Sequence, residues 1–232
     1  MMFNVYYIME FLFWKSWVKK ERILNIEFGV LKREDLKEAV EMSVRAYEDY
    51  AYFANYFPDT TERLKMLWAV MYRGWLTFFS QARFLTARVD GKIVGLAELE
   101  PPHFKRPSVF QFLIHGWLQV YLDVNFKRMQ TWLAMDESAG KPCHDYQKSG
   151  PGIWYIGSLT VDPPFQGKGI GTKLIDFAGD YVRERGGKQL TLFTNSEKNI
   201  SFYTKCGFET FHKCDIAHDG KTMGSWSVKK SV

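Results

Sequence analysis

The order of elements along the chain predicts an α+β fold. A strand, a glycine-rich turn and a helix follow one another from Trp154 to about Val182, and a second strand and helix run from Gln189 to Phe208. Strand-like segments also meet at Asp90-Gly91 and at Asp219-Gly220, dipeptides that close tight hairpins. The whole predicted order is β-α-α-β-β, an insertion, and then β-α-β-α-β-β.

The composition is that of a globular protein with a sizeable core. The chain has 232 residues, 46% of them apolar and 25% charged, and a net charge of +5. This mild positive charge suits an anionic ligand and gives no argument for nucleic acid. The three cysteines and three of the histidines are not spaced as a zinc site or a disulfide framework: Cys143, Cys206, Cys214, His103, His115 and His144. We therefore expect reduced thiols, no metal and a cytoplasmic location.

The first 22 residues predict a separate extension. Apolar and aromatic residues dominate up to Trp14, and Lys15, Lys19 and Lys20 follow. The run is too short and too polar to span a membrane, and its charges come in the reverse order of a signal peptide. We expect an extra helix or strand packed on the domain or on a partner subunit of a homodimer. A helix on a membrane surface and an over-long start of the coding sequence are the alternatives.

Residues 23–232 predict one domain. Its first half contains a strand, two helices and a hairpin: Arg22 to Leu31, Lys32 to Tyr47, about Thr61 to Ser80, Arg83 to Val89 and Lys92 to Leu99. Asp59 or Thr60 can cap the second helix, and six aromatic residues lie between Tyr47 and Phe57. Glu98 and Glu100 point to the same face of the last strand, because successive side chains alternate.

Residues 103–152 form an insertion. Phe112 to Met135 has helical periodicity, whereas Asp136 to Gly152 is loop-like because it contains two glycines and two prolines, Gly140, Pro142, Gly150 and Pro151. Loops on a rigid scaffold often carry specificity. We interpret the insertion as a lid or a wall of the binding pocket, with a dimer contact as the alternative.

The stretch from Trp154 to Thr172 predicts a phosphate-binding turn. Pro163 and Pro164 end its strand at about Asp162. Glycines then alternate with other residues: Gly167, Lys168, Gly169, Ile170 and Gly171. Glycine lets a ligand approach the backbone amides, and free N–H groups at a helix N-terminus attract phosphate. An ordinary glycine-rich strand-to-helix turn is the alternative.

The spacing of this turn selects among phosphate ligands. In a Walker A loop lysine precedes Ser or Thr, whereas here Thr172 precedes Lys173. The dinucleotide fingerprint fails because Thr172 stands at its third glycine position. The pattern that fits is Q-x-x-G-x-G at Gln166, Gly169 and Gly171. In this pattern the stretch resembles the GNAT-type N-acetyltransferases, in which the loop holds the pyrophosphate of acetyl-CoA.

A second motif supports this resemblance. After the strand that begins at Gln189, Asn199, Tyr203 and Gly207-Phe208 fall on positions where the family has an Asn, a helical Tyr and Gly-Phe. Alone, Tyr203 fits a packed ring and Asn199 a helix cap. The resemblance covers about residues 23–232, with its specific motifs between Ser158 and Phe208.

The resemblance implies one domain with a mixed, mostly antiparallel sheet flanked by helices. The strands that begin near Trp154 and Gln189 should be parallel and splayed where acetyl-CoA enters. The aromatic segment 47–57 should line the acceptor site, or alternatively form a plain packing cluster. The cofactor contacts should come from Leu159, Val161, Gln166, Gly167, Lys168, Gly169, Ile170, Gly171, Thr172, Asn195, Asn199 and Tyr203.

The implied reaction is direct transfer of an acetyl group to an amine. Tyr203 would protonate the leaving thiolate, and Glu98 would accept the proton of the amine, directly or through water. A solvated or salt-bridged carboxylate is the alternative for Glu98. An acetyl-CoA-binding sensor with little catalysis is the alternative function, and an aromatic-rich interaction protein would leave the glycine loop unexplained.

Overall fold

The computed structural model describes residues 24–218 and 220–232, so the predicted extension at residues 1–22 lies outside the described residues. The first part of the fold consists of β1 Glu27–Val30, η1 Arg33–Asp35, α2 Leu36–Tyr47, α3 Ala51–Tyr56, α4 Thr60–Phe78, β2 Arg83–Val89 and β3 Lys92–Glu100. The insertion follows as α5 Val109–Ile114, α6 Leu118–Asp123 and α7 Phe126–Lys148. The remainder consists of β4 Ile153–Val161, η2 Pro163–Phe165, α8 Ile170–Arg183, β5 Gln189–Thr194, α9 Glu197–Lys205, β6 Glu209–His218 and β7 Lys221–Ser231.

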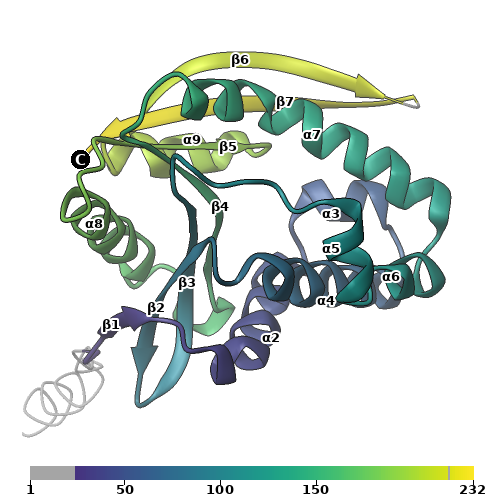
Figure 1. The fold of residues 1–232 in the computed structure, drawn as a ribbon, viewed down its shortest axis with the longest axis horizontal. Coiled ribbons are helices and arrows are strands. Elements are labelled where there is room, and N and C mark those ends of the chain that lie inside the picture. Colours follow the sequence, from purple (N-terminus) through teal and green to yellow (C-terminus); the bar gives the residue numbers. More distant parts are fainter. Residues whose placement is uncertain (1–23, 219) are drawn as a thin grey trace, which may run out of the picture.

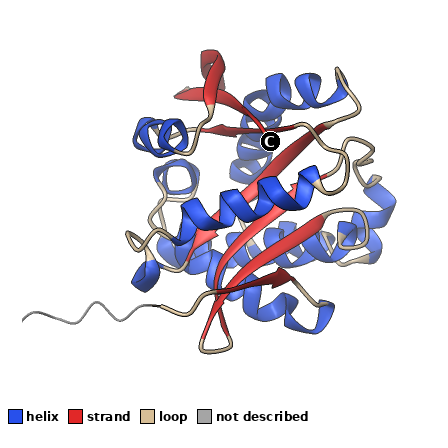
Figure 2. Cartoon of the chain, turned by 90° about the vertical axis from the view of Figure 1, so that its left-hand side faces the viewer, coloured by secondary structure: helices blue, strands red, loops and turns tan. Residues whose placement is uncertain are grey.

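These strands form one mixed sheet in the order β1-β2-β3-β4-β5-β7-β6. Every neighbouring pair is antiparallel except β4 and β5, which are parallel. Figure 2 shows these strands in red, seen from the side on which α8 lies. The predicted α+β fold with a mixed, mostly antiparallel sheet is therefore confirmed.

Helices cover both faces of the sheet and create two cores. Figure 1 shows α8 on one side of the central strands and α2 and α4 on the other. One core joins α2, α3, α4 and α7 to residues such as Phe84 and Leu96 of the sheet. The other core joins α8 and α9 to Ala97, Leu99 and neighbouring strands. Successive residues of β3 enter different cores, as the alternation of side chains along a strand requires.

The parallel pair β4 and β5 separates after a short contact. Pairing is confined to Ile153, Trp154 and Tyr155, opposite Gln189, Leu190 and Thr191. Both strands continue beyond these pairs, β4 to Val161 and β5 to Thr194. The predicted parallel, splayed pair is thus confirmed, and the opening lies at the carboxyl ends of both strands.

The predicted boundaries differ from the observed ones in the first half. The first helix begins with the short turn η1, so α2 itself starts at Leu36. The aromatic segment contains an additional helix, α3. Helix α4 starts at Thr60, and the Asp59 side chain accepts a hydrogen bond from the Glu62 N–H at 2.7 Å, which confirms the predicted cap.

The predicted loop from Asp136 to Gly152 is wrong, because α7 continues to Lys148 through Gly140 and Pro142. Its buried residues include four spaced by one turn, Met135, Ala139, Cys143 and Gln147. A Cβ at Gly140 would lie 3.2 Å from the Phe193 ring of β5, so glycine permits this close packing. Tertiary packing therefore outweighs the local preference of Gly and Pro.

The predicted helix from Phe112 to Met135 is divided among α5, α6 and the start of α7. Gly116 adopts a φ of 79° after α5, a conformation that favours glycine. The Asn125 side chain accepts a hydrogen bond from the Arg128 N–H at 3.1 Å and caps α7. The insertion is therefore helical for most of its length, and its longest helix crosses the sheet beside β4, β5, β6 and β7.

Candidate active site

The glycine loop has the geometry of an anion-binding turn. Gly167 and Gly169 adopt φ values of 75° and 76°, which L-residues with a side chain rarely adopt. A Cβ on either would meet no atom within 4 Å, so the space above the loop is open. Gly169 caps α8, whose first hydrogen bond runs from the Lys173 N–H to the Gly169 carbonyl. The preceding N–H groups of the first turn donate to no other described residue and can bind a ligand.

A cavity of about 700 Å³ opens between this loop and the separated strands. Most of the predicted site residues line it: Leu159, Val161, Gln166, Gly167, Gly169, Ile170, Gly171, Thr172, Asn195, Asn199 and Tyr203. Its lining also includes residues of α2, the segment around α3, and α7. The structure therefore brings together both predicted motifs in one space.

One edge of β4 is open toward the cavity. The Asp162 N–H donates to the Val94 carbonyl at 2.9 Å, so alternate residues of β4 direct their main-chain groups toward β3. The main-chain groups of Leu159 and Val161 consequently face the other way, where β5 has separated. The Gln166 Nε2 donates to the Val161 carbonyl at 2.9 Å and occupies one of these groups. An extended ligand can pair with those that remain.

Side chains of α2 fix β4 and Asp162 in place from one face of the sheet. The contacts are Ser43 with Thr160 at 2.9 Å, Tyr47 with Ser158 at 3.1 Å, and Arg45 with Asp162 at 3.0 and 3.1 Å. The Arg45 pair is bidentate, the arrangement that best fixes a carboxylate. The sequence reasoning did not identify these contacts, because Ser43 and Arg45 carry no motif.

Helix α9 presents Asn199 and Tyr203 to the cavity, one turn apart. The Asn199 Nδ2 donates to the Thr194 Oγ1 at 3.1 Å. The Tyr203 side chain is 8% exposed, and burial raises the pKa of its phenol. Among the described residues its hydroxyl makes no hydrogen bond, so the phenol keeps its proton and is free to donate it to a ligand.

Three predicted site residues are placed differently from the rest. The Lys168 Nζ donates to the Pro164 carbonyl at 2.8 Å and lies 5.0 Å from the centre of the Phe165 ring, and Lys168 does not line the cavity. The Asn195 Nδ2 donates to the Gly224 carbonyl at 3.0 Å, which ties this lining residue to β7. Glu98 lies behind the cavity wall, because it is 4% exposed and does not line the space.

Glu98 is a buried carboxyl with an unused oxygen. It pairs with Ser158 across the sheet, and Leu99 pairs with Ile156, so Gly157 is the extra residue of a β-bulge. A Cβ at Gly157 would overlap the Glu98 carboxylate, and glycine therefore makes room for it. Among the residues that the structure describes, none hydrogen-bonds to the Glu98 Oε1. Burial, and then the neighbouring Glu100 carboxyl, raise the pKa of Glu98 well above its usual range.

Sequence reasoning missed two features of this region. Gly157 stands inside a strand pattern, which is a signal for a bulge and could have been recognised. Asp136 lines the cavity from α7, but it falls in the segment that the sequence predicted as a loop. No local pattern marks Asp136, since its position depends on the path of α7 across the sheet.

Comparison with known proteins identifies the family. The profile described as the acetyltransferase (GNAT) family matches residues 46–208, which is most of the chain and includes the glycine loop, β5 and α9. The chain belongs to the GNAT acetyltransferase family. The resemblance inferred from the two motifs is thus confirmed.

Similar proteins agree with this family. An uncharacterized N-acetyltransferase of Methanocaldococcus jannaschii is 26% identical over 179 residues, which cover 76% of this chain and 58% of that relative's length. A Corynebacterium glutamicum structure described as histone acetyltransferase HPA2 and related acetyltransferase matches with a TM-score of 0.61 and 17% identity, over 88% of this chain and 95% of that one. A Thermoplasma acidophilum PaiA N-acetyltransferase in complex with coenzyme A matches with a TM-score of 0.53 and 16% identity, over 90% and 100% of the two chains.

The part of the chain that the structure describes contains neither a membrane-spanning helix nor a cluster of metal ligands. None of its helices combines the length and apolar character needed to cross a bilayer. The same residues contain no group of three or more His, Cys, Asp or Glu side chains that could hold a metal ion.

Proposed function

We propose that this GNAT-family protein transfers the acetyl group of acetyl-CoA directly to an amine. The observation that carries the proposal is the joining, in one cavity, of a glycine loop, an open strand edge and the unpartnered Tyr203 hydroxyl. A phosphate-binding turn alone suits many cofactors. The open edge of β4 adds a surface for an extended amide-containing arm, which is the chemistry of pantetheine.

The cofactor contacts follow from these features. The free N–H groups from Gly169 to Thr172, at the start of α8, would hold the pyrophosphate. The main-chain groups of Leu159 and Val161 would bind the pantetheine arm, and Asn199 lines the same cavity. The coenzyme A complex of the Thermoplasma acidophilum neighbour supports this choice of cofactor for the shared fold.

The chemistry needs one proton acceptor and one proton donor. The amine arrives mostly as an ammonium ion and must lose a proton before its nitrogen lone pair can attack the thioester carbonyl. A nitrogen–carbon bond then forms and the carbon–sulfur bond breaks. The leaving thiolate takes a proton from the Tyr203 phenol, and the phenolate recovers one from the nitrogen that has been acylated. The balanced products are an amide, free CoA thiol and one proton released from the ammonium ion.

Glu98 is the acceptor that we assign to the first of these protons. Its raised pKa brings the carboxylate closer to the basicity needed to deprotonate an ammonium ion near neutral pH. The carboxyl is separated from the cavity only by the bulge at Gly157, which lines that space. A proton can therefore reach Glu98 through water or after a small rotation of its side chain.

Calorimetry and a thiol-release assay test the proposed function together. We expect CoA and acetyl-CoA to bind in the micromolar range, about −8 kcal/mol, and to bind more tightly than NAD or ATP. We expect thiol release from acetyl-CoA to depend on an amine from a panel of acceptors. Preferential binding of NAD or ATP would contradict the cofactor assignment. Binding of CoA without thiol release from any amine would favour an acetyl-CoA sensor.

A further inference from the structure

The wall of the cavity opposite the glycine loop is aromatic and acidic. Its aromatic lining is Tyr47, Tyr50, Tyr52, Phe53 and Tyr155. The charged residues of the lining are Asp49 and Asp136, and no lysine or arginine lines the described cavity. An anionic acceptor would find no cationic side chain there, whereas a cationic one would find carboxylates and ring faces.

Asp136 is the carboxylate best placed to hold a cation. The Tyr52 hydroxyl donates to its Oδ1 at 3.0 Å, which fixes the side chain between α3 and α7. The Tyr52 and Phe53 rings lie 5.1 Å apart in an edge-to-face arrangement, and both line the same cavity. Carboxylates combined with aromatic faces recognise organic ammonium groups. Burial raises the pKa of Asp136, so a cation bound nearby would stabilise its ionised form.

Two further carboxyls lie behind this wall. Glu98 and Glu100 are 4% and 7% exposed, and the Glu98 Oε1 has no hydrogen-bond partner within residues 24–218 and 220–232. The Glu98 carboxylate lies against Gly157, a residue of the cavity lining. A buried carboxyl therefore lies directly behind this part of the wall, and one of its oxygens has no partner among the described residues.

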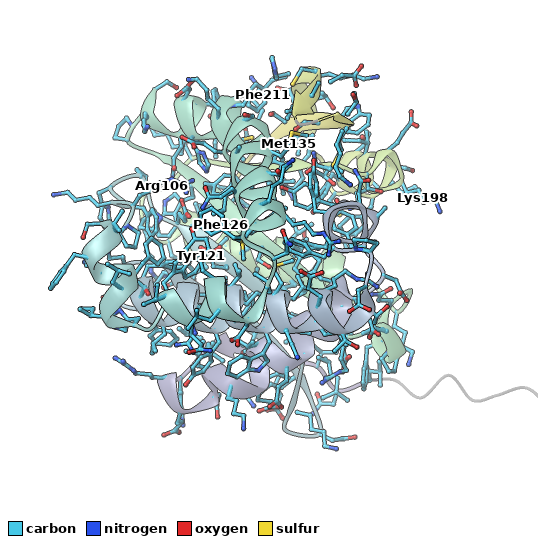
Figure 3. All side chains as sticks on the ribbon, turned by 90° about the vertical axis from the view of Figure 1, so that its right-hand side faces the viewer. Arg106, Tyr121, Phe126, Met135, Lys198 and Phe211 are labelled. Atoms are coloured by element: carbon cyan, nitrogen blue, oxygen red, sulfur yellow. The ribbon has the colours of Figure 1, made fainter. Side chains whose placement is uncertain are left out.

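The nearby positive charge does not balance these acids. Arg106 is the cation that lowers the pKa of Glu98, Glu100 and Asp136. It is exposed, and Figure 3 shows it beside α7, where its guanidinium contacts the His144 ring at 2.6 Å. The pKa of His144 is lowered to about 4 by burial and by Arg106, so His144 is neutral. One exposed guanidinium thus faces three carboxyls.

The protonation state of the reacting nitrogen restricts which cation can bind beside Asp136. The nitrogen that attacks the thioester must be neutral at that moment, so it cannot be the cation that the Asp136 carboxylate holds. A second cationic group on the acceptor keeps its charge throughout the reaction.

We propose that the acceptor is a diamine or a longer polycation with a primary amine at one end. Its second ammonium group binds Asp136 beside Tyr52 and Phe53, and its reacting nitrogen lies near Gly157. This inference rests on the proposed acetyl transfer. The reacting ammonium gives its proton to Glu98, the new amide bond replaces the thioester bond, and the second ammonium remains protonated at Asp136.

A matched series of acceptors tests the proposal on the full-length wild-type protein. 1,4-Diaminobutane, 1-aminobutane and 4-aminobutanoate each contain four carbons and end, opposite the reacting amine, in an ammonium, a methyl and a carboxylate group, and the three- and five-carbon series control for length. We expect kcat/KM for the best diamine to exceed that for its monoamine by at least about tenfold, as one added ion pair at an effective dielectric near 20 would give. The amino acid should be the poorest of each set.

Two variants test which carboxylate binds the second ammonium group of the acceptor. Asp136→Asn keeps an oxygen for the Tyr52 hydroxyl but removes the charge, and we expect it to lower the diamine-to-monoamine ratio by about tenfold. Asp49→Asn removes the same charge from an exposed lining residue and should leave this ratio within about twofold. A diamine preference that survives Asp136→Asn in folded protein overturns the assignment of Asp136. Should that variant fail to fold, the wild-type series still decides whether a second charge is recognised.

The outcomes separate this inference from the proposed function. Thiol release with monoamines as good as or better than diamines would overturn the dication and leave acetyl transfer standing. Without thiol release from any amine, calorimetry of the CoA-bound protein with 1,4-diaminobutane and 1-aminobutane decides. Tighter binding of the diamine supports the cation site even though the transfer fails, and equal or undetectable binding of the two amines overturns it.

Discussion

Gly169→Asp tests whether the start of α8 binds a pyrophosphate. The φ of Gly169 is 76°, and a Cβ there meets no atom within 4 Å, so the cost of a side chain is conformational rather than steric. Asn and Asp tolerate this region better than other residues and share a backbone cost of about 1 kcal/mol. Gly169→Asn is therefore the matched control for charge.

The expected difference between the two variants comes from electrostatics. Two unit charges about 6 Å apart repel by about 3 kcal/mol at an effective dielectric near 20. We therefore expect the Asp variant to bind CoA about 100-fold more weakly than the Asn variant, with the gap narrowing at high salt. Calorimetry at two salt concentrations measures both effects.

A second control separates binding from stability. Gly186 lies beyond the other end of α8 with a φ of 74° and no atom within 4 Å of its Cβ position. Gly186→Asp should lower the melting temperature as Gly169→Asp does while leaving CoA affinity intact. Equal CoA affinities for the Asp and Asn variants at position 169 would refute a phosphate site at this helix.

Three other changes test individual side chains. Tyr203→Phe keeps the ring and should lower turnover by roughly 100-fold with little change in CoA affinity or melting temperature; full turnover with chemistry rate-limiting would remove its role as the acid. Burial raises the pKa of Glu100 to about 7 in the folded protein, above its usual 4.5, so folding takes up a proton and stability falls as pH rises between these values. Glu100→Gln should flatten this slope in urea titrations and gain up to about 3 kcal/mol at pH 8; an unchanged slope would contradict the assignment. Gly157→Ala should displace the Glu98 carboxylate and lower kcat by a larger factor than the loss of folded protein explains. Gly29→Ala, where a Cβ meets no atom, should change neither kcat nor the melting temperature. Equal kcat values for the two variants would exclude Gly157 as the residue that positions Glu98.

Local sequence chemistry was sufficient to predict much of the fold. Two glycines with positive φ, at positions 167 and 169, stand where the motif required tight backbone turns. Strand alternation predicted that Glu98 and Glu100 share a face, and the two carboxyls of β3 lie close enough for Glu100 to raise the pKa of Glu98. Both results depend on residues close together in sequence.

The sequence-based predictions were wrong or incomplete where segments distant in sequence determine the structure. Pro142 and Gly140 predicted a loop, but packing of α7 against β5 and the other strands keeps the segment helical. Asp136 therefore reached the cavity wall without a local signal. The burial of Glu98 behind Gly157 likewise depends on the bulge between β3 and β4, which only the paired strands reveal.

The short contact between β4 and β5 also means that a ligand in the gap would add to the contacts between the two halves of the sheet, which α7 and α8 already bridge. Three residue pairs join these halves directly, from Ile153 to Tyr155 on β4. A ligand laid along the open edge would act as the missing strand and would bind the folded state alone. At 100 times its dissociation constant, such a ligand adds about 2.7 kcal/mol to the free energy of unfolding. The concentration of cosubstrate in the cell would then affect the stability of the folded protein as well as its rate of turnover.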